Sequence, residues 1–135
     1  MRVRCGCGGV ELEIAAEPMA QFFCHCDDCQ AAHGAAYVPE SVYRADEVRI
    51  LKGEPASWAL ERNPRFFCQD CGTRLFIEVT ALGLRGVNGY LLPVGAFRPR
   101  YHMQCRFALQ PVRDGLPHYR AIAPQFGGPD VCVDW

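Results

Sequence analysis

The sequence predicts a mainly β protein made of several short antiparallel strands in small sheets, with minor helical turns. Short apolar stretches recur along the chain, and in Val10–Ile14 apolar and acidic residues alternate with the period of two that a half-buried strand requires. The chain contains 13 glycines and 10 prolines, which interrupt these stretches as they do in β-rich domains. Cysteines grouped at three places can tie such short elements together by binding metal.

The composition is that of an ordinary globular protein. The chain has 135 residues, of which 50% are hydrophobic and 21% charged, and this suits a single domain over residues 1–135. The formal net charge of -1 argues against a protein that neutralises many phosphates, so we expect no nucleic-acid partner. The N-terminus lacks the apolar core of a signal peptide, and no apolar run reaches the ~18–20 residues that span a bilayer. We therefore expect a cytoplasmic protein with no membrane partner.

The first part of the chain predicts strands on both sides of a short helix. Residues 10–14 form the alternating strand described above, and the mostly apolar residues 19–23 predict a second strand that leads into a cysteine cluster. Residues 28–33 can form one or two helical turns, which Gly34 ends. The apolar residues 35–38 then predict extended backbone.

The middle of the chain predicts further short elements. Residues 41–53 show weak helical or turn character, and residues 57–60 and 75–79 predict strands. The glycine-rich residues 83–89 predict a hairpin loop, and residues 90–94 predict the strand that follows it. The tail is rich in glycine and proline, so we expect it to be mostly irregular between short strands.

Nine cysteines are far more than packing alone requires in a chain of this size. Their odd number and the lack of a signal peptide favour metal binding over disulfides. Seven of them fall in three clusters, Cys5-x-Cys7, Cys24-x-Cys26-x-x-Cys29 and Cys68-x-x-Cys71. The last resembles a zinc knuckle, in which both sulfurs face one metal at ~2.3 Å. A thioredoxin-like redox pair has the same spacing, but the βαβ context that it needs is absent.

Counting ligands favours two metal sites of different kinds. A structural zinc is closed by four ligands, whereas a catalytic zinc keeps three protein ligands and one exchangeable position. The two pairs make one closed site of four cysteines and leave the triple as an open site. Other divisions are possible, because one cysteine of the triple could join a pair, or a histidine could close the triple. His25 is a poor candidate, since the middle side chain of a C-x-C turn points away from the metal, but His33, one turn further along, is possible.

The thiolate ligands of the triple narrow its chemistry. Three thiolates leave a bound Zn²⁺ with a formal charge of about -1 and reduce its Lewis acidity. Zinc deaminases use such sites, but they need a His-x-Glu motif, which this sequence lacks. A soft, thiolate-rich zinc suits a further thiolate, and coordination deprotonates a thiol whose free pKa is about 8.5. The triple therefore predicts a site that holds a substrate thiol as a nucleophile.

The cysteine pattern resembles that of the glutathione-dependent formaldehyde-activating family, also called the CENP-V/GFA domain. The resemblance covers roughly residues 2 to 120 and rests on all seven clustered cysteines, with Gly34, Gly72, the Arg65-Phe66-Phe67 stretch and the Asp114-Gly115-Leu116-Pro117 stretch. One departure is Ala31-Ala32 after the triple, where a basic residue is expected in many relatives. A grip on the glutathione carboxylates is therefore not expected at that point.

The resemblance implies a β-tent fold and two Zn²⁺ ions, one structural and one catalytic. The implied structural ligands are Cys5, Cys7, Cys68 and Cys71, and the implied catalytic ligands are Cys24, Cys26 and Cys29. The implied reaction joins glutathione and formaldehyde to S-(hydroxymethyl)glutathione, a carbon–sulfur lyase activity when read in reverse.

Two hypotheses follow. In the first, the protein is an enzyme that adds glutathione or a similar thiol to formaldehyde or another small electrophile. In the second, it is a non-catalytic zinc-binding module with a structural or interaction role. A fold hosts sites of differing purpose, so the resemblance alone does not choose the substrate.

The remaining polar and aromatic residues carry weaker predictions. Lone cysteines are usually buried, so core packing is expected for Cys105 and Cys132. His25 either orients a group near the metal or is exposed, and His33 either lines the site or caps the helix. His102 has no spacing partner and is assigned no role, and the same holds for His118.

Side chains next to the clusters are expected to have structural roles. The aromatic residues, expected to pack in the core rather than to wall a pocket, are Phe22, Phe23 and Tyr37. The acidic residues, expected to be solvated or to accept backbone amides, are Asp27 and Asp28. The arginines, expected to be surface charges rather than anion ligands, are Arg65, Arg74 and Arg98.

Overall fold

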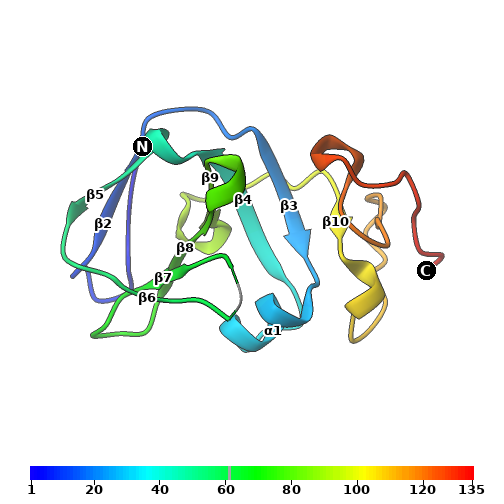
Figure 1. Cartoon of the computed structure of the whole chain (residues 1–135), viewed down its shortest axis with the longest axis horizontal. Helices are drawn as coiled ribbons and strands as arrows, with labels where there is room; N and C mark the ends of the chain where they lie inside the picture. The colour runs from blue at the N-terminus through cyan, green and yellow to red at the C-terminus, as the bar shows by residue number, and fades with distance from the viewer. Residues whose placement is uncertain (61) are drawn as a thin grey trace. The chain divides into compact units, whose positions relative to one another are not determined.

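The computed structural model describes residues 1–60 and 62–135, and within these residues it has ten β-strands, one α-helix and five short 3₁₀ turns (Figure 1). The predicted mainly β class is confirmed. The chain divides into two compact units, one made of Met1–Ala20 and Ser41–Phe97 and the other of Gln21–Glu40 and Arg98–Trp135. That residues 1–135 form a single domain stays a prediction.

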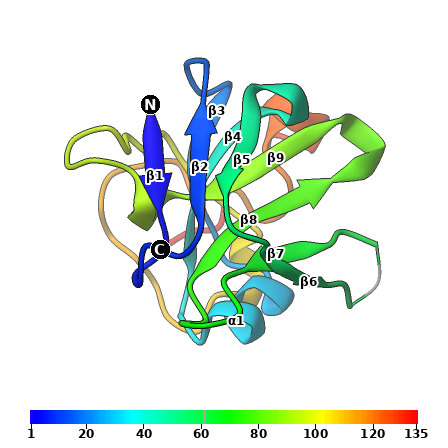
Figure 2. The ribbon, with the colours of Figure 1, turned by 90° about the vertical axis from the view of Figure 1, so that its left-hand side faces the viewer.

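The first unit contains a three-stranded antiparallel sheet in the order β1-β2-β5 (Figure 2). Its strands are β1 (Arg2–Arg4), β2 (Glu11–Ile14) and β5 (Val48–Lys52). The alternation predicted for residues 10–14 is observed, because Leu12 and Ile14 are buried while Glu11 and Glu13 are half-buried. Leu12 is paired with Val3 on β1, so the buried side chains of both strands face the same core.

Four more strands of this unit pair as antiparallel neighbours in the order β9-β8-β7-β6. Their bounds are β6 (Ala56–Trp58), β7 (Arg65–Phe67), β8 (Arg74–Val79) and β9 (Leu84–Asn88). Phe66 and Phe76 are paired across β7 and β8, and their rings stack with centroids 4.5 Å apart. The core of the unit is lined by buried side chains from these strands and from the segments between them, namely Val3, Cys5, Val10, Leu12, Ile14, Tyr43, Val48, Cys68, Leu75, Phe76, Val87 and Leu92.

The predicted loop at residues 83–89 and the predicted strand at 90–94 are both wrong. Residues 84–88 form β9, whose Gly86 pairs with Ile77 on β8. Pairing with a neighbouring strand outweighs the low β-propensity of glycine, which depends strongly on context. Gly89–Leu91 is instead a 3₁₀ turn, capped by the Asn88 side chain, which accepts a hydrogen bond from the Tyr90 amide at 3.1 Å.

The weak helical or turn character predicted for residues 41–53 holds only for the 3₁₀ turn Ala45–Glu47 and is wrong for the strands on either side of it. The strand β4 (Val38–Arg44) precedes this turn and β5 follows it. All residues of β4 except Arg44 are buried, on both faces of the strand. Its sequence therefore lacks the alternation of apolar and polar residues by which a half-buried strand is predicted. Of the extended segment predicted at residues 35–38, only Val38 lies in a strand.

The second unit contains β3 (Ala20–Cys24), the helix α1 (Asp27–His33) and β10 (His102–Met103). The two strands are parallel, with His102 opposite Phe23, which departs from the antiparallel expectation. The predicted helix is confirmed, and it ends at Gly34 with φ 60°, a left-handed conformation that glycine adopts without strain. Among the described residues, no helix combines the length and the apolar character needed to cross a membrane.

Candidate metal centres

The first half of the four-cysteine cluster is the turn between β1 and β2. The Gly8 amide donates to the Cys5 carbonyl at 3.0 Å, and the Cys5 amide donates to the Val10 carbonyl at 3.0 Å. Gly8 has φ 73°, which a residue with a side chain rarely adopts, so glycine permits the tight turn. The Val10 amide also donates to the Cys5 sulfur at 3.2 Å, which favours the thiolate form of that ligand.

The second half is the turn between β7 and β8. The Cys68 amide donates to the Thr73 carbonyl and the Gly72 amide donates to the Cys68 carbonyl, both at 2.9 Å. Gly72 has φ 71°, as expected for the glycine that closes a zinc knuckle. The two halves are joined through Thr73, whose hydroxyl accepts from the Gly6 amide at 3.1 Å and lies 3.1 Å from the Cys71 sulfur.

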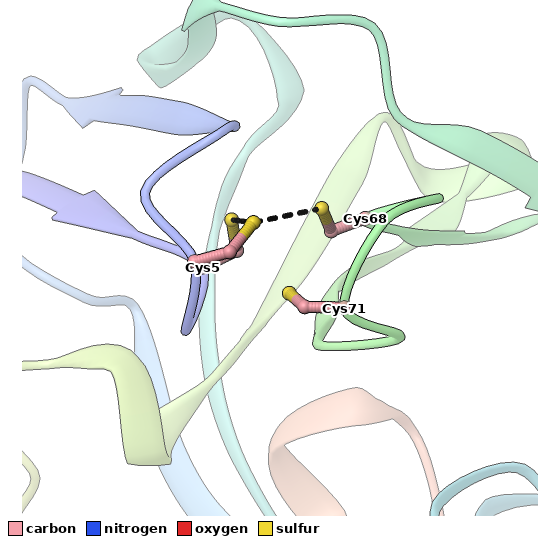
Figure 3. Close-up of side chains that lie close together, drawn as sticks. Cys5, Cys68 and Cys71 are labelled. Carbon is pink, nitrogen blue, oxygen red and sulfur yellow. Dashed lines mark hydrogen bonds between the residues drawn. The ribbon is translucent and has the colours of Figure 1, made fainter.

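The four sulfurs lie close enough together to hold one metal ion, and Figure 3 shows the labelled Cys5, Cys68 and Cys71 in this cluster. All of them lie within 4.8 Å of one another, and the sulfur of Cys7 is 3.5 Å from that of Cys5 and 3.7 Å from that of Cys68. Tetrahedral zinc with Zn–S bonds of ~2.3 Å separates its sulfurs by about 3.8 Å. Cys5 and Cys68 are buried, while Cys7 and Cys71 are exposed. The cluster therefore fits a closed metal site at the edge of the core.

The thiol pKa values show how strongly these four groups interact. Hydrogen bonds from the Thr73 side chain and backbone lower the pKa of Cys71 to about 5. The Gly9 amide lowers the pKa of Cys7, but the neighbouring thiols Cys5, Cys71 and Cys68 together raise it to about 12. One thiolate thus suppresses ionisation of the next, and a bound cation would relieve that repulsion.

The triple lies where β3 meets α1. Cys24 is the last residue of β3, Cys26 is the N-cap of the helix, and Cys29 lies in its first turn. The Cys29 amide donates to the Cys26 sulfur at 3.2 Å, in place of the usual oxygen cap. Gln30 fixes the loop, because its side-chain amide donates to the His25 carbonyl at 2.7 Å and to the Phe107 carbonyl at 2.9 Å.

The three sulfurs also lie within 4.8 Å of one another. Cys24 and Cys29 are buried, whereas Cys26 is partly exposed. Within the described residues, no histidine or carboxylate joins this group, so neither His25 nor His33 lies where it would close the triple. The three thiols could therefore hold a metal that keeps one position accessible from the side of Cys26.

Crowding and burial raise the pKa values of the Cys24 and Cys29 thiols. Hydrogen bonding with Cys26 and Cys29 and then burial raise the pKa of Cys24 well above its ordinary value. Cys24 lowers the pKa of Cys29 through its hydrogen bond, but Cys26 and burial outweigh it and raise that pKa overall. Three closely packed thiols cannot all ionise alone, whereas coordination to a metal deprotonates them. The residues of the triple fit the metal that their spacing predicts.

A row of histidines next to the triple was not predicted from sequence. His25 is buried, and its Nε2 lies 2.8 Å from Nδ1 of His102, which is 77 positions away. Nε2 of His102 lies 2.7 Å from Asp114, and His118 lies 3.2 Å from the same carboxylate. Burial, followed by the neighbouring His102 and His118, lowers the pKa of His25 to about 4. Asp114 and His118 are four residues apart, but His25 is 77 positions from His102, so only the fold reveals the whole group.

Several smaller predictions are settled by burial. Cys105 is buried as expected, but Cys132 is exposed, so its predicted core packing is wrong. Arg65 is buried rather than a surface charge, and its guanidinium lies 5.6 Å from the centre of the Trp58 ring. The Asp27 carboxylate accepts from the next backbone amide at 3.0 Å, as expected.

The aromatic residues beside the triple pack against other rings, as expected. Phe22 stacks on Tyr101 with centroids 5.4 Å apart, and Phe23 meets the edge of Tyr37 at 5.2 Å. Tyr37 also lies 4.9 Å from the ring of His25. These contacts bury the polar ring of His25 beside the cysteine loop.

Comparison with known proteins adds the family. No curated protein matches the chain. A crystal structure of a Rhodobacter sphaeroides protein, a target of a structural genomics consortium, is similar with 21% identity and a TM-score of 0.56 over 70% of this chain and 89% of the other. At this identity the likeness supports the fold alone. The family described as glutathione-dependent formaldehyde-activating enzyme matches residues 1–107 of the 135, and the chain belongs to this family.

Proposed function

We propose that the protein is a zinc-dependent enzyme that adds glutathione or a similar thiol to formaldehyde or another small electrophile. In the reverse direction this is a carbon–sulfur lyase reaction, like that of an S-(hydroxymethyl)glutathione synthase. Membership of the glutathione-dependent formaldehyde-activating family supports this class of function. The observation that carries the proposal is the contrast between a cluster of four cysteines and a cluster of three with no further described ligand.

The two clusters are assigned different roles. Cys5, Cys7, Cys68 and Cys71 would hold a structural Zn²⁺ whose four positions are all filled by protein. Cys24, Cys26 and Cys29 would hold the catalytic Zn²⁺ and leave one position for substrate. When bound there, the metal would supply deprotonation of an incoming thiol.

The chemistry of the addition is simple to balance. The thiolate sulfur adds to the carbonyl carbon of formaldehyde and forms a carbon–sulfur bond. The electron pair of the C=O π bond moves to oxygen, which takes up one proton and becomes the hydroxyl of the hydroxymethyl group. No oxidant or reductant is required.

The chain contributes a fixed and largely dry setting for this addition. Gln30 ties the cysteine loop to the backbone at His25 and Phe107, so the ligands are held in place before substrate arrives. Burial of Cys24 and Cys29 leaves the partly exposed Cys26 as the open side. Ala31 and Ala32 offer no charge to a substrate carboxylate, so recognition of the thiol compound must rely on other residues.

The cellular setting follows from the ligands. Thiolate ligands survive best where thiols are kept reduced, so we expect the protein to act in the cytoplasm. The near-neutral charge and the apolar patterning supply no reason to expect a nucleic-acid or membrane partner.

Exchange spectroscopy by NMR tests the proposal directly. Glutathione and formaldehyde combine reversibly in buffer, so the exchange rate is measured with and without the zinc-loaded protein. We expect the wild type to accelerate exchange and Cys26→Ser, which removes a ligand of the triple, to lose this acceleration. Cys132→Ser is the control and should accelerate exchange like the wild type, because Cys132 lies outside the triple. An exchange rate with the wild type equal to that in buffer would show that formaldehyde is not the substrate.

Metal analysis separates this function from the alternative of a non-catalytic zinc-binding module. If the protein is the proposed enzyme, Cys26→Ser should lose about one zinc per chain together with the activity. A wild type that holds one zinc per chain, unchanged in Cys26→Ser, would support the module instead.

A further inference from the structure

We propose that His102, Asp114 and His118 form a third metal site, distinct from both cysteine clusters, for a divalent transition metal such as Zn²⁺. Nε2 of His102 lies 2.7 Å from Oδ2 of Asp114, and Nε2 of His118 lies 3.2 Å from Oδ1 of the same carboxylate. One ligand atom from each residue lies within 4.8 Å of the other two. The site does not depend on the function proposed for the triple.

Backbone pairing brings His102 and His118 together, and a turn places Asp114 beside them. His102 pairs with His118 as a parallel bridge, in which the His102 amide donates to the Pro117 carbonyl at 2.8 Å and the Tyr119 amide donates to the His102 carbonyl at 2.9 Å. The Leu116 amide donates to Oδ1 of Asp114 at 3.1 Å and fixes the turn between them. The three ligand groups are therefore pre-arranged, as a metal site requires.

One nitrogen of the group has no hydrogen bond. Nε2 of His118 is buried and makes no hydrogen bond within the described residues, although it lies 3.2 Å from Asp114. The two atoms are close but do not form a hydrogen bond, so this nitrogen lacks a partner among the described residues. A buried nitrogen without a hydrogen-bond partner is unfavourable, and a metal ion would pair it.

The ligand set defines the kind of ion. Two imidazoles and one carboxylate are typical ligands of zinc with an open position and of other first-row transition metals. This donor set carries one negative charge, so a bound divalent ion would keep a net charge of about +1. It would be a stronger Lewis acid than zinc bound by three thiolates.

The surroundings suit an ion that exchanges with solvent. The side chain of His102 is 0% exposed and that of His118 is 11% exposed, whereas that of Asp114 is 33% exposed and offers an entry path. The ring of Trp135 packs on His118 with centroids 4.7 Å apart and covers it from another side. Burial of the imidazoles lowers the local dielectric and strengthens their interaction with a cation.

The proposal makes a specific statement about the tautomers of His25 and His102. Without metal, Nε2–H of His102 donates to Asp114, so its Nδ1 accepts a hydrogen bond from Nε2–H of His25. With metal on Nε2, the hydrogen of His102 moves to Nδ1 and is donated to Nε2 of His25. The hydrogen of His25 must then lie on Nδ1. Metal binding thus reverses the direction of this hydrogen bond.

The first experiment counts metal. The purified holoprotein and its variants are dialysed to equilibrium against micromolar Zn²⁺, and zinc per chain is measured by mass spectrometry. We expect Asp114→Asn and His118→Ala to hold about one zinc per chain fewer than the wild type, and the exposed-acid control Asp130→Asn to match it. Equal zinc contents in the wild type and both site variants would overturn the proposal. The experiment compares zinc per chain between the wild type and the variants, so the zinc held by the cysteine clusters cancels from the difference.

The second experiment uses the wild type alone and so does not depend on whether a variant folds. Histidine side chains labelled with ¹⁵N are followed by NMR as Zn²⁺ is added beyond the amount taken up by the cysteines. We expect the Nε2 signals of His102 and His118 to shift and the protonated nitrogen of His25 to change from Nε2 to Nδ1. Histidine signals that stay unchanged throughout the titration would overturn the proposal.

Discussion

Nε2 of His25 lies 2.8 Å from Nδ1 of His102, which joins the loop of the triple to strand β10. The parallel pairing of β10 with β3 places His102 opposite Phe23 and Met103 opposite Cys24, so His25 follows directly after the paired residues. The His25 amide donates to the Met103 carbonyl at 3.0 Å, which extends this pairing by one hydrogen bond. His25 therefore anchors the loop that carries Cys24 and Cys26 through a buried side chain bonded to His102.

Two substitutions of His25 should lower the free energy of unfolding to different extents. His25→Phe keeps the ring but leaves Nδ1 of His102 without its partner, which costs about 1–3 kcal/mol. His25→Ala also removes the ring that packs on Tyr37, and we expect a larger total loss of about 3–5 kcal/mol. Urea unfolding of the metal-loaded protein measures both values. An alanine variant as stable as the phenylalanine variant would show that the ring packing contributes nothing.

The four-cysteine cluster should contribute more to stability than any other group of thiols. Cys68 is 1% exposed and belongs to the core of its unit, so Cys68→Ser removes a metal ligand and places a hydroxyl among apolar side chains. We expect a loss on the order of 5 kcal/mol together with one zinc per chain. Thermal unfolding and metal analysis check this. Cys132→Ser, at an exposed position, is the matched control and should stay within about 0.5 kcal/mol of the wild type.

Gly53 supports the first half of this cluster from outside. It has φ 78°, and an added Cβ would collide with the backbone carbonyl of Gly9, next to the turn that carries Cys5 and Cys7. Gly83 has a similar φ of 63°, but an added Cβ there meets nothing within 4 Å.

The two glycines therefore separate steric collision from backbone strain. Gly83→Ala should cost about 1–2 kcal/mol from the left-handed conformation alone. Gly53→Ala should cost clearly more and should weaken zinc retention, because the backbone near Cys7 has to move. Chemical unfolding with a competing chelator measures both effects, and equal losses for the two variants would argue against the collision.

The two lone cysteines should differ in their reactivity toward an alkylating reagent. Burial, with smaller effects of Cys132 and Asp114, raises the pKa of Cys105 to about 12, so only about one in 10⁴ of its thiols is ionised at pH 8. The thiolate is the reactive form, and at pH values below that pKa its fraction rises about tenfold with each unit of increase in pH. We expect iodoacetamide to label the exposed Cys132 first in zinc-loaded protein. Peptide mass spectrometry checks the order, which equal labelling of both cysteines at pH 8 would contradict.

Much of the fold could be predicted where the signal is local. The alternation in residues 10–14 and the helix that ends at Gly34 were found because both depend on neighbouring residues. The strand β9 was missed because its stability comes from pairing with β8, to which a glycine-rich sequence gives no clue. The burial of Arg65 was missed for a similar reason, since the ring of Trp58 that lies beside its guanidinium belongs to the neighbouring strand.

The sequence by itself determined the cysteine clusters and the family. Metal ligands are spaced by the length of a turn, so C-x-C and C-x-x-C patterns are visible without a structure. Only the tertiary structure decided which of the two lone cysteines is buried and that His25, His102, Asp114 and His118 form one group. His25 and His102 lie far apart in the chain, and the pairing of β10 with β3, rather than sequence spacing, brings their rings within hydrogen-bond distance.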